Sequence, residues 1–210
     1  PGATPISVKL EQRRIVPLVK EISKNWDIPV SIDTQSSLVA SAALQNGATI
    51  VNDVSGLKSD SAMAAAISES GASCIVMACN HQPGDCTTIT EVQGALEHSL
   101  NIASSADIPK EQIVVDPGIG FGKPTYSDLL ILQNLKDLRG LGHPILVGVS
   151  RKAFIGYVLG YPLPSQRLAG TLAAVSVAVM NGAHIIRAHD VRESKDCIAM
   201  IEAITKAKDG

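Results

Sequence analysis

Short apolar runs rich in isoleucine and valine alternate along this chain with longer segments of helical periodicity, and no other feature constrains the fold as strongly. The predicted strands are residues 28–33, 48–53, 72–78, 112–116, 144–150 and 183–187. The predicted helices are residues 8–24, 37–45, 60–68, 90–103, 126–139, 166–181 and 192–207. This alternation predicts parallel strands joined by right-handed helical crossovers. No linker or shift in composition divides the 210 residues, so we expect one domain over residues 1–210.

Local signals mark several helix ends. Gly47, Gly71 and Gly182 each lie between a predicted helix and the following strand, where a residue in the left-handed conformation ends a helix. Thr88 begins a Thr-x-x-Glu sequence, the pattern of a capping box. Pro17 is expected to kink the first helix or to mark its start.

Composition and charge exclude several classes of protein. Hydrophobic residues make up 45% of the chain and charged residues 18%, which excludes a disordered chain. The formal net charge is −2 and no Lys/Arg run exceeds two residues, so we expect no nucleic-acid partner and no membrane surface. No apolar stretch approaches the ~20 residues that span a bilayer. Four cysteines do not make a disulfide framework at this length, which favours reduced thiols and a cytoplasmic location.

Polar side chains stand at or just past the end of every predicted strand. They are Asp33; Asn52 and Asp53; Cys79 and Asn80; Asp116; Ser150 and Lys152; and Arg187 and His189. An open doubly wound sheet uses mainly one switch point, whereas a barrel brings all its strand ends to one mouth. The sequence therefore favours a (β/α)8 TIM barrel, of which six strand–helix units, corresponding to strands three to eight, are present.

Asp33, Asn52 and Asp116 form the most specific set. Two carboxylates with an amide on the strand between them match a ligand edge that carries both donors and acceptors, such as a 2-amino-4-oxopyrimidine. Each aspartate taken alone has a second interpretation, because a carboxylate at a strand end also caps the helix that follows.

Residues 118–123, a glycine-rich sequence, lack two requirements of a phosphate-binding loop. Pro124 follows Lys123 where that motif needs serine or threonine, and Pro117 stands where its first glycine would be. A tight glycine loop after Asp116 remains. It holds Phe121 near the mouth, where the ring is suited to wall an aromatic ligand or simply to pack.

Cations follow the last two predicted strands. Lys152 faces the predicted carboxylates and is suited to grip a ligand, whereas Arg151 also fits a solvated loop. Arg187 and His189 alternate along the chain, point the same way and suit a cluster of anionic oxygens. A structural pair between His189 and Asp190 is the alternative.

Cys79, His81 and Cys86 include metal-ligating residue types. Zinc needs a fourth ligand and a more compact spacing, so we favour a mobile loop of free thiols, and the role of these three side chains stays open.

Five motifs in order resemble the dihydropteroate synthase family of pterin-binding barrels. They are Ser31-Ile32-Asp33-Thr34, Asn52-Asp53-Val54-Ser55-Gly56, Asp116-Pro117-Gly118-Ile119-Gly120-Phe121-Gly122-Lys123, Gly148-Val149-Ser150-Arg151-Lys152 and Arg187-Ala188-His189-Asp190-Val191. The resemblance implies a homodimeric transferase of folate biosynthesis. It would join 6-hydroxymethyl-7,8-dihydropterin pyrophosphate to 4-aminobenzoate and release pyrophosphate, with Mg²⁺ assisting.

The resemblance also implies roles for single residues. The implied catalytic residues are Asp33, Asp116 and Lys152; the pterin is held by Asp33, Asn52, Asp116, Gly148 and Lys152, the pyrophosphate by Arg187 and His189, and the arylamine by Phe121, Ser150 and Arg151. Loss of pyrophosphate would leave a cation-like pterin methylene, which the arylamine captures. The aspartates would stabilise positive charge in the ring, while the arginine, the histidine and Mg²⁺ stabilise the leaving oxyanions.

Three departures from the family's pattern accompany the resemblance. The family's first two strands, with the asparagine loop that holds the metal, would precede Pro1. We therefore expect an N-terminally incomplete barrel with two unpaired edge strands and no metal ligand in this chain. Residues 77–84 replace a Met-His-x-Arg-Gly sequence, and Ala153 stands where the family often has serine. A related arylamine, a modified pterin, a pterin-dependent methyltransferase and a non-catalytic pterin-binding paralogue are the alternatives.

Overall fold

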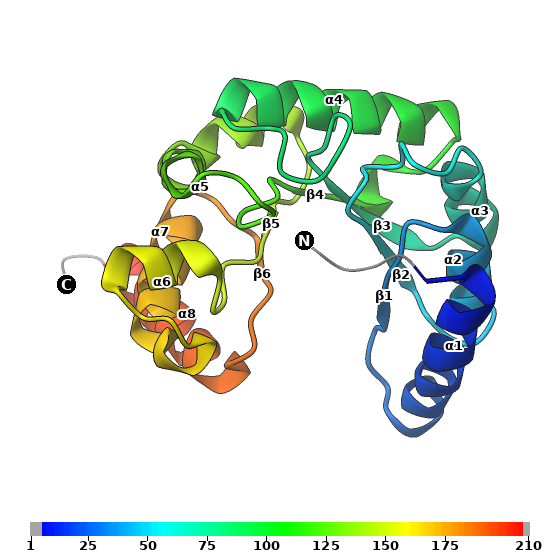
Figure 1. The fold of residues 1–210 in the computed structure, drawn as a ribbon, viewed down its shortest axis with the longest axis horizontal. Coiled ribbons are helices and arrows are strands. Elements are labelled where there is room, and N and C mark those ends of the chain that lie inside the picture. Colours follow the sequence, from blue (N-terminus) through cyan, green and yellow to red (C-terminus); the bar gives the residue numbers. More distant parts are fainter. Residues whose placement is uncertain (1–5, 208–210) are drawn as a thin grey trace.

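The computed structural model describes residues 6–207, and this part of the chain contains six parallel strands. They are β1 (Ser31–Asp33), β2 (Ile50–Asp53), β3 (Ser73–Met77), β4 (Ile113–Asp116), β5 (Leu146–Val147) and β6 (Ile185–Ile186). β1 to β4 form one sheet in chain order, and β5 pairs with β6. A parallel bridge between Val115 and Ile145 links the two sheets. The strands line the inside of an arc and the helices cover its outside (Figure 1).

The strand order decides between the two architectures that the sequence allows. Each strand pairing joins strands that are consecutive in the chain, and the order never reverses. A doubly wound sheet needs such a reversal at its switch point, whereas a barrel does not. The barrel-type β/α fold is therefore confirmed. The assignment of these strands as the third to eighth of eight stays a prediction.

Eight α-helices cover the strands within residues 6–207. They are α1 (Val8–Asn25), α2 (Ser37–Leu44), α3 (Met63–Ser70), α4 (Ile89–Ser105), α5 (Thr125–Gln133), α6 (Ala153–Leu159), α7 (Leu168–Met180) and α8 (Val191–Lys206). Short 3₁₀ helices occur at Lys110–Gln112, Leu135–Leu141 and Pro164–Gln166.

One helix prediction is wrong in detail, and one helix was missed. The helix predicted at residues 126–139 divides at Asn134 into α5 and a 3₁₀ helix, because asparagine and the nearby Gly140 are weak helix formers. The helix α6 was not predicted. Its seven residues are almost all apolar, and a run this short shows no helical period.

The predicted helix ends agree better with the structure. Gly47, Gly71 and Gly182 all have positive φ, as their place between helix and strand requires. Pro17 lies inside α1, which begins at Val8, so it does not mark the start of that helix.

Aliphatic side chains fill the core, as a chain with six aromatic residues requires. Ala40 and Ala43 of α2 are fully buried, and their small side chains let the helix approach the sheet closely. Fully buried Val51 and Val76 hold the middle of the first sheet. Because each strand is fixed by its core residues, the polar residue at its carboxyl end has a defined position at the mouth.

Thr88 should stabilise α4 measurably. Its side chain accepts a hydrogen bond from the Glu91 backbone N–H, and the Glu91 side chain accepts one from the Thr88 N–H, which completes a capping box. We expect Thr88→Ala to lower the free energy of unfolding by ~1 kcal/mol. Thr90→Ala, an exposed threonine of the same helix without a capping contact, is the matched control. Urea unfolding curves measure both; equal losses would contradict the capping role.

Candidate active site

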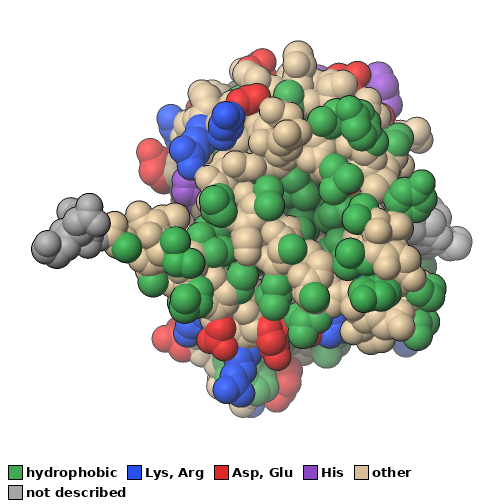
Figure 2. Space-filling view, turned by 90° about the vertical axis from the view of Figure 1, so that its left-hand side faces the viewer, with side chains coloured by type: hydrophobic (Ala, Val, Ile, Leu, Met, Phe, Trp, Pro, Cys, Tyr) green, Lys and Arg blue, Asp and Glu red, His purple; other side chains and the backbone are tan. Residues whose placement is uncertain are grey.

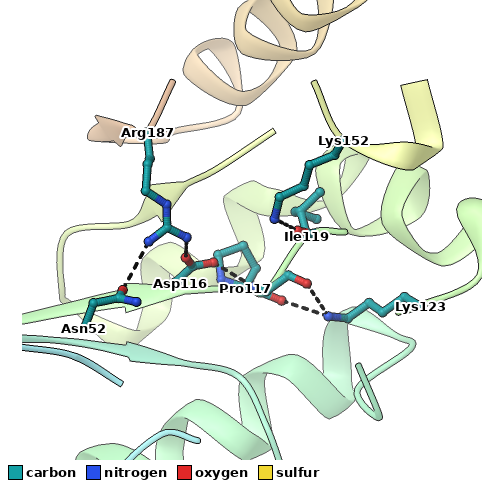
Figure 3. Close-up of polar contacts among 8 residues, drawn as sticks. Asn52, Asp116, Pro117, Ile119, Lys123, Lys152 and Arg187 are labelled. Carbon is teal, nitrogen blue, oxygen red and sulfur yellow. Dashed lines mark hydrogen bonds and ion pairs between the residues drawn. The ribbon is translucent and has the colours of Figure 1, made fainter. Parts of the chain in front are cut away.

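A buried carboxylate, an amide and a guanidinium from three strand ends are joined by hydrogen bonds (Figure 3). Asp116, at the end of β4, is 2% exposed; its Oδ1 accepts from the Gly118 N–H at 2.7 Å. Its Oδ2 accepts from Arg187 Nη2 at 3.1 Å. Arg187 Nη1 also donates to Asn52 Oδ1, at 3.2 Å. Asn52, Asp116 and Arg187 are 64 to 135 positions apart in the sequence, and only the parallel strand order brings them together.

Asp33 lies next to this cluster, because β1 pairs with β2 in the register that places Asp33 opposite Asn52. Part of the Asp33 surface is exposed, yet its carboxyl group lies among protein atoms. This burial raises the pKa of Asp33 above its ordinary value. The positive charge of the Arg187 guanidinium offsets the shift only in part. The structure therefore brings together the acceptor set that the sequence predicted.

The glycine loop after β4 is held in place by two buried charged side chains. Asp128 Oδ1 accepts from the Gly120 N–H at 2.8 Å, and Lys123 Nζ donates to the Gly118 carbonyl at 2.6 Å. Both residues are at least nine-tenths buried. Sequence reasoning did not select either one as functional. The available signal for Lys123 was its place at the end of the glycine-rich residues 118–122, and no comparable signal marks Asp128.

Lys152 lies across this loop. Its Nζ donates to the Ile119 carbonyl and stands 4.6 Å from the centre of the Phe121 ring. A Cβ at Gly120 would come 2.2 Å from Lys152 Cδ, so only glycine leaves room for the lysine side chain. Burial lowers the pKa of Lys152 to about 8, against the opposing effect of Asp116.

A cavity of about 330 Å³ lies beside the cluster. It is lined by Gly148, Ser150, Lys152, Arg187, Ala188 and His189. The Ser150 Oγ bonds with His189 Nδ1 at 2.9 Å and accepts from the His189 N–H at 3.1 Å, which orients the imidazole. Ammonium, guanidinium and imidazole groups together make this cavity suitable for an anion. Arg187 stands between the cavity and the acceptor set.

Arg151 differs from the other predicted site residues. Its guanidinium binds Asp190 through Nε at 3.0 Å and Nη2 at 2.5 Å, and it does not line the cavity. This ion pair ties the loop after β5 to the start of α8. Asp190 is therefore paired with Arg151 rather than with His189, and the alternative of a structural His189–Asp190 pair is wrong.

The loop that contains Cys79, His81 and Cys86 is tied by Asp85, which sequence reasoning did not select. Its carboxylate accepts from the N–H groups of residues 80, 81 and 82 at 2.7–3.1 Å. Although burial opposes it, these donors hold the pKa of Asp85 well below its usual range. Cys79 and Cys86 are buried free thiols, and burial raises the pKa of Cys86 to about 12. Such thiols are poor nucleophiles and poor metal ligands.

Within residues 6–207, no three His, Cys, Asp or Glu side chains are grouped to hold a metal ion.

A larger hollow at the amino ends of the strands is lined by fewer reactive side chains. It measures about 420 Å³, lies between α2 and α3, and has Glu69 as its one titratable lining residue. The carboxylates and cations are therefore gathered at the mouth, the end of the strands at which barrel active sites lie.

Acceptors for a heterocycle edge beside a cationic cavity define a class of barrel enzyme that binds an aromatic ring carrying an anionic group. Comparison with known proteins makes this class specific. The pterin binding enzyme family matches residues 1–189. The dihydropteroate synthase of Clostridium beijerinckii is 36% identical over 98% of this chain and 77% of its own length. That of Bacillus subtilis is 35% identical over 97% of this chain and 71% of its own length.

Solved structures agree. A dihydropteroate synthase from Clostridium difficile, determined in the presence of pteroic acid, is 38% identical with a TM-score of 0.92, and the match covers 99% of this chain and 79% of that one. A Xanthomonas albilineans dihydropteroate synthase with 4-aminobenzoic acid is 35% identical, also with a TM-score of 0.92, over 99% of this chain and 76% of that one. The chain belongs to the pterin binding enzymes and, within them, to the dihydropteroate synthase family.

None of the helices in residues 6–207 is both long and apolar enough to cross a membrane.

Proposed function

We propose that the protein transfers a pterinylmethyl group from 6-hydroxymethyl-7,8-dihydropterin pyrophosphate to 4-aminobenzoate, giving dihydropteroate and pyrophosphate. The observation that carries the proposal is the acceptor set of Asp116 and Asn52 directly beside the cationic cavity, with Arg187 between them. A substrate with a hydrogen-bonding heterocycle and a polyanionic leaving group matches both halves. The dihydropteroate synthases to which the chain is similar support the same reaction.

The pterin would be bound by Asp33, Asn52, Asp116 and Lys152, beside Gly148, over which the Arg187 side chain lies. The Asp116 carboxylate accepts from the ring N–H and amino groups, and the Asn52 amide both accepts and donates. Lys152, once released from the Ile119 carbonyl, donates to a ring oxygen or nitrogen. The two carboxylates stabilise positive charge that develops in the ring as the leaving group departs.

The pyrophosphate would occupy the cavity lined by Arg187 and His189. The carbon–oxygen bond breaks and its electron pair leaves with the pyrophosphate, whose new charge the guanidinium and imidazole stabilise. The arylamine nitrogen then bonds to the pterin methylene and loses a proton to solvent.

The arylamine would lie against Phe121. The Lys152 ammonium already lies over the ring of this residue. Ser150 and Arg151 are the other proposed contacts. Each is engaged within the protein, Ser150 with His189 and Arg151 with Asp190, so an arylamine carboxylate would share these groups rather than find them free.

Pyrophosphate release tests the proposed reaction. We expect release from the pterin pyrophosphate to depend on added 4-aminobenzoate, with dihydropteroate as the second product. Asp116→Asn should lower kcat/KM by roughly 10- to 100-fold, the loss of a charge-assisted contact. Methyl transfer from a methylated pterin would favour the methyltransferase alternative. Pterin binding without release would favour the non-catalytic one.

The pKa of Lys152 predicts the pH dependence of pterin binding. The ammonium is charged below about pH 8 and neutral above it, so its contact with the pterin should be lost as pH rises through about 8. In Lys152→Arg the cation stays charged, and the alkaline decline should move upward by at least two pH units. Titration of pterin binding between pH 6 and 10 measures this; a decline at the same pH in both proteins would contradict it.

We also propose a homodimer, formed through the face that α5, α6 and α7 present. Figure 2 shows hydrophobic side chains gathered on this side of the molecule. Tyr157 is 80% exposed, Met180 66% and Val158 55%. An apolar cavity of about 350 Å³ opens among these helices, and none of its lining residues is charged. An apolar face without charges can pack against the same face of a second copy without burying an unpaired charge, which suits a two-fold interface. A cytoplasmic location and a need for Mg²⁺ stay predictions.

Molar mass in solution tests the dimer. We expect light scattering at micromolar concentration to give twice the 21.9 kDa of the chain. Val177→Glu, which places a charge in the apolar cavity, should give the single-chain mass. Leu18→Glu, an equally drastic change at an exposed residue of α1, is the control and should remain dimeric. A monomer in the unsubstituted protein would overturn the proposal.

A further inference from the structure

We infer that Arg187 occupies part of the pterin subsite when no substrate is bound, and that an anion in the neighbouring cavity draws it away. Arg187 would then make pterin binding and pyrophosphate binding cooperative. This inference rests on the proposed function and adds to it a coupling between the two subsites.

The chemistry of the two occupants is alike. A guanidinium and the 2-amino-4-oxopyrimidine edge of a pterin both present N–H donors around a carbon bonded to three nitrogens. Arg187 donates through Nη2 to Asp116 Oδ2 at 3.1 Å and through Nη1 to Asn52 Oδ1 at 3.2 Å. These are the acceptors that the pterin needs. The guanidinium and the heterocycle therefore compete for the same oxygens.

The fit of Arg187 is incomplete, and the missing contact identifies the better occupant. Asn52 is 3% exposed, and its Nδ2 has no hydrogen-bond partner. Arginine carries only donors and cannot satisfy this amide N–H, whereas a pterin ring nitrogen is an acceptor. A buried donor without a partner is unfavourable, so replacement of Arg187 by the pterin removes a cost as well as forming contacts.

The structure also provides a second place for the guanidinium. Arg187 lines the 330 Å³ cavity together with His189, and its side chain remains 40% exposed. The Arg187 side chain lies over Gly148. A Cβ built at Gly148 would be 3.2 Å from Arg187 Nε, so the glycine leaves room for the arginine side chain. The side chain is therefore neither buried nor tightly confined. Rotation toward an anion in the cavity would free Asp116 and Asn52.

Linkage gives this arrangement a measurable consequence. When the pterin binds alone, it must displace Arg187 from Asp116, and its apparent affinity falls by the fraction of protein in which the subsite is open. When an anion holds Arg187 in the cavity, that fraction rises. Each ligand then strengthens binding of the other by the same factor.

The experiment is a calorimetric titration of free 6-hydroxymethylpterin, with and without inorganic pyrophosphate. In the unsubstituted protein we expect pyrophosphate to tighten pterin binding by about fivefold or more, within the usual range of coupling between sites. In Arg187→Ala the pterin alone should bind more tightly than to the unsubstituted protein, and pyrophosphate should have no further effect. Arg192→Ala, an exposed arginine of α8, is the matched control and should behave as the unsubstituted protein.

The outcomes separate the inference from the proposed function. Weaker or equal binding of free pterin by Arg187→Ala would overturn the inference, because a merely structural arginine would support the pocket and its loss would weaken every ligand. Absence of coupling in the unsubstituted protein would overturn it without recourse to any variant. Failure of the unsubstituted protein to bind pterin at all would overturn the proposed function as well.

Discussion

The mouth of this protein is organised around one buried charge, the carboxylate of Asp116. A carboxylate that is 2% exposed is stable only if its oxygens are hydrogen-bonded, and here the Gly118 N–H and the Arg187 guanidinium do so. The first contact turns the chain into the glycine loop at the end of β4. The second ties that strand end to the last strand. A single buried group thus sets both the loop and the position of the arginine.

The glycine loop connects this charge to the rest of the site. Asp128 holds the Gly120 N–H, and Lys123 holds the Gly118 carbonyl. With the backbone fixed on both sides, the Ile119 carbonyl and the Phe121 ring receive Lys152. The loop therefore acts as a rigid base for a cation and an aromatic ring, although it lacks the sequence of a phosphate-binding loop. Its glycines serve close approach of side chains rather than of phosphate.

The charges of the mouth are arranged as two neighbouring regions of opposite character. Asp33 and Asp116 face one side, and His189 faces a cavity on the other, with Arg187 between them. Such an arrangement suits a substrate that is cationic in its ring during reaction and loses an anion. It also places Arg187 where its guanidinium can pair with the nearest carboxylate, that of Asp116.

Local sequence patterns were enough to predict the class of fold, the approximate positions of the strands and the residue types at the mouth, although β5 (Leu146–Val147) is shorter than the strand predicted at residues 144–150. Periodicity and glycine positions depend only on neighbouring residues. They therefore predict strands at residues 28–33 and 48–53, which end at Asp33 and just after Asn52. Tertiary structure decided which of these side chains touch. Arg187 meets Asn52 across 135 positions of the chain, Arg151 binds Asp190 instead of facing the cavity, and Asp128 turns back to the glycine loop. Partners of buried and half-buried charges are set by packing over long distances in the chain, and no local pattern records them.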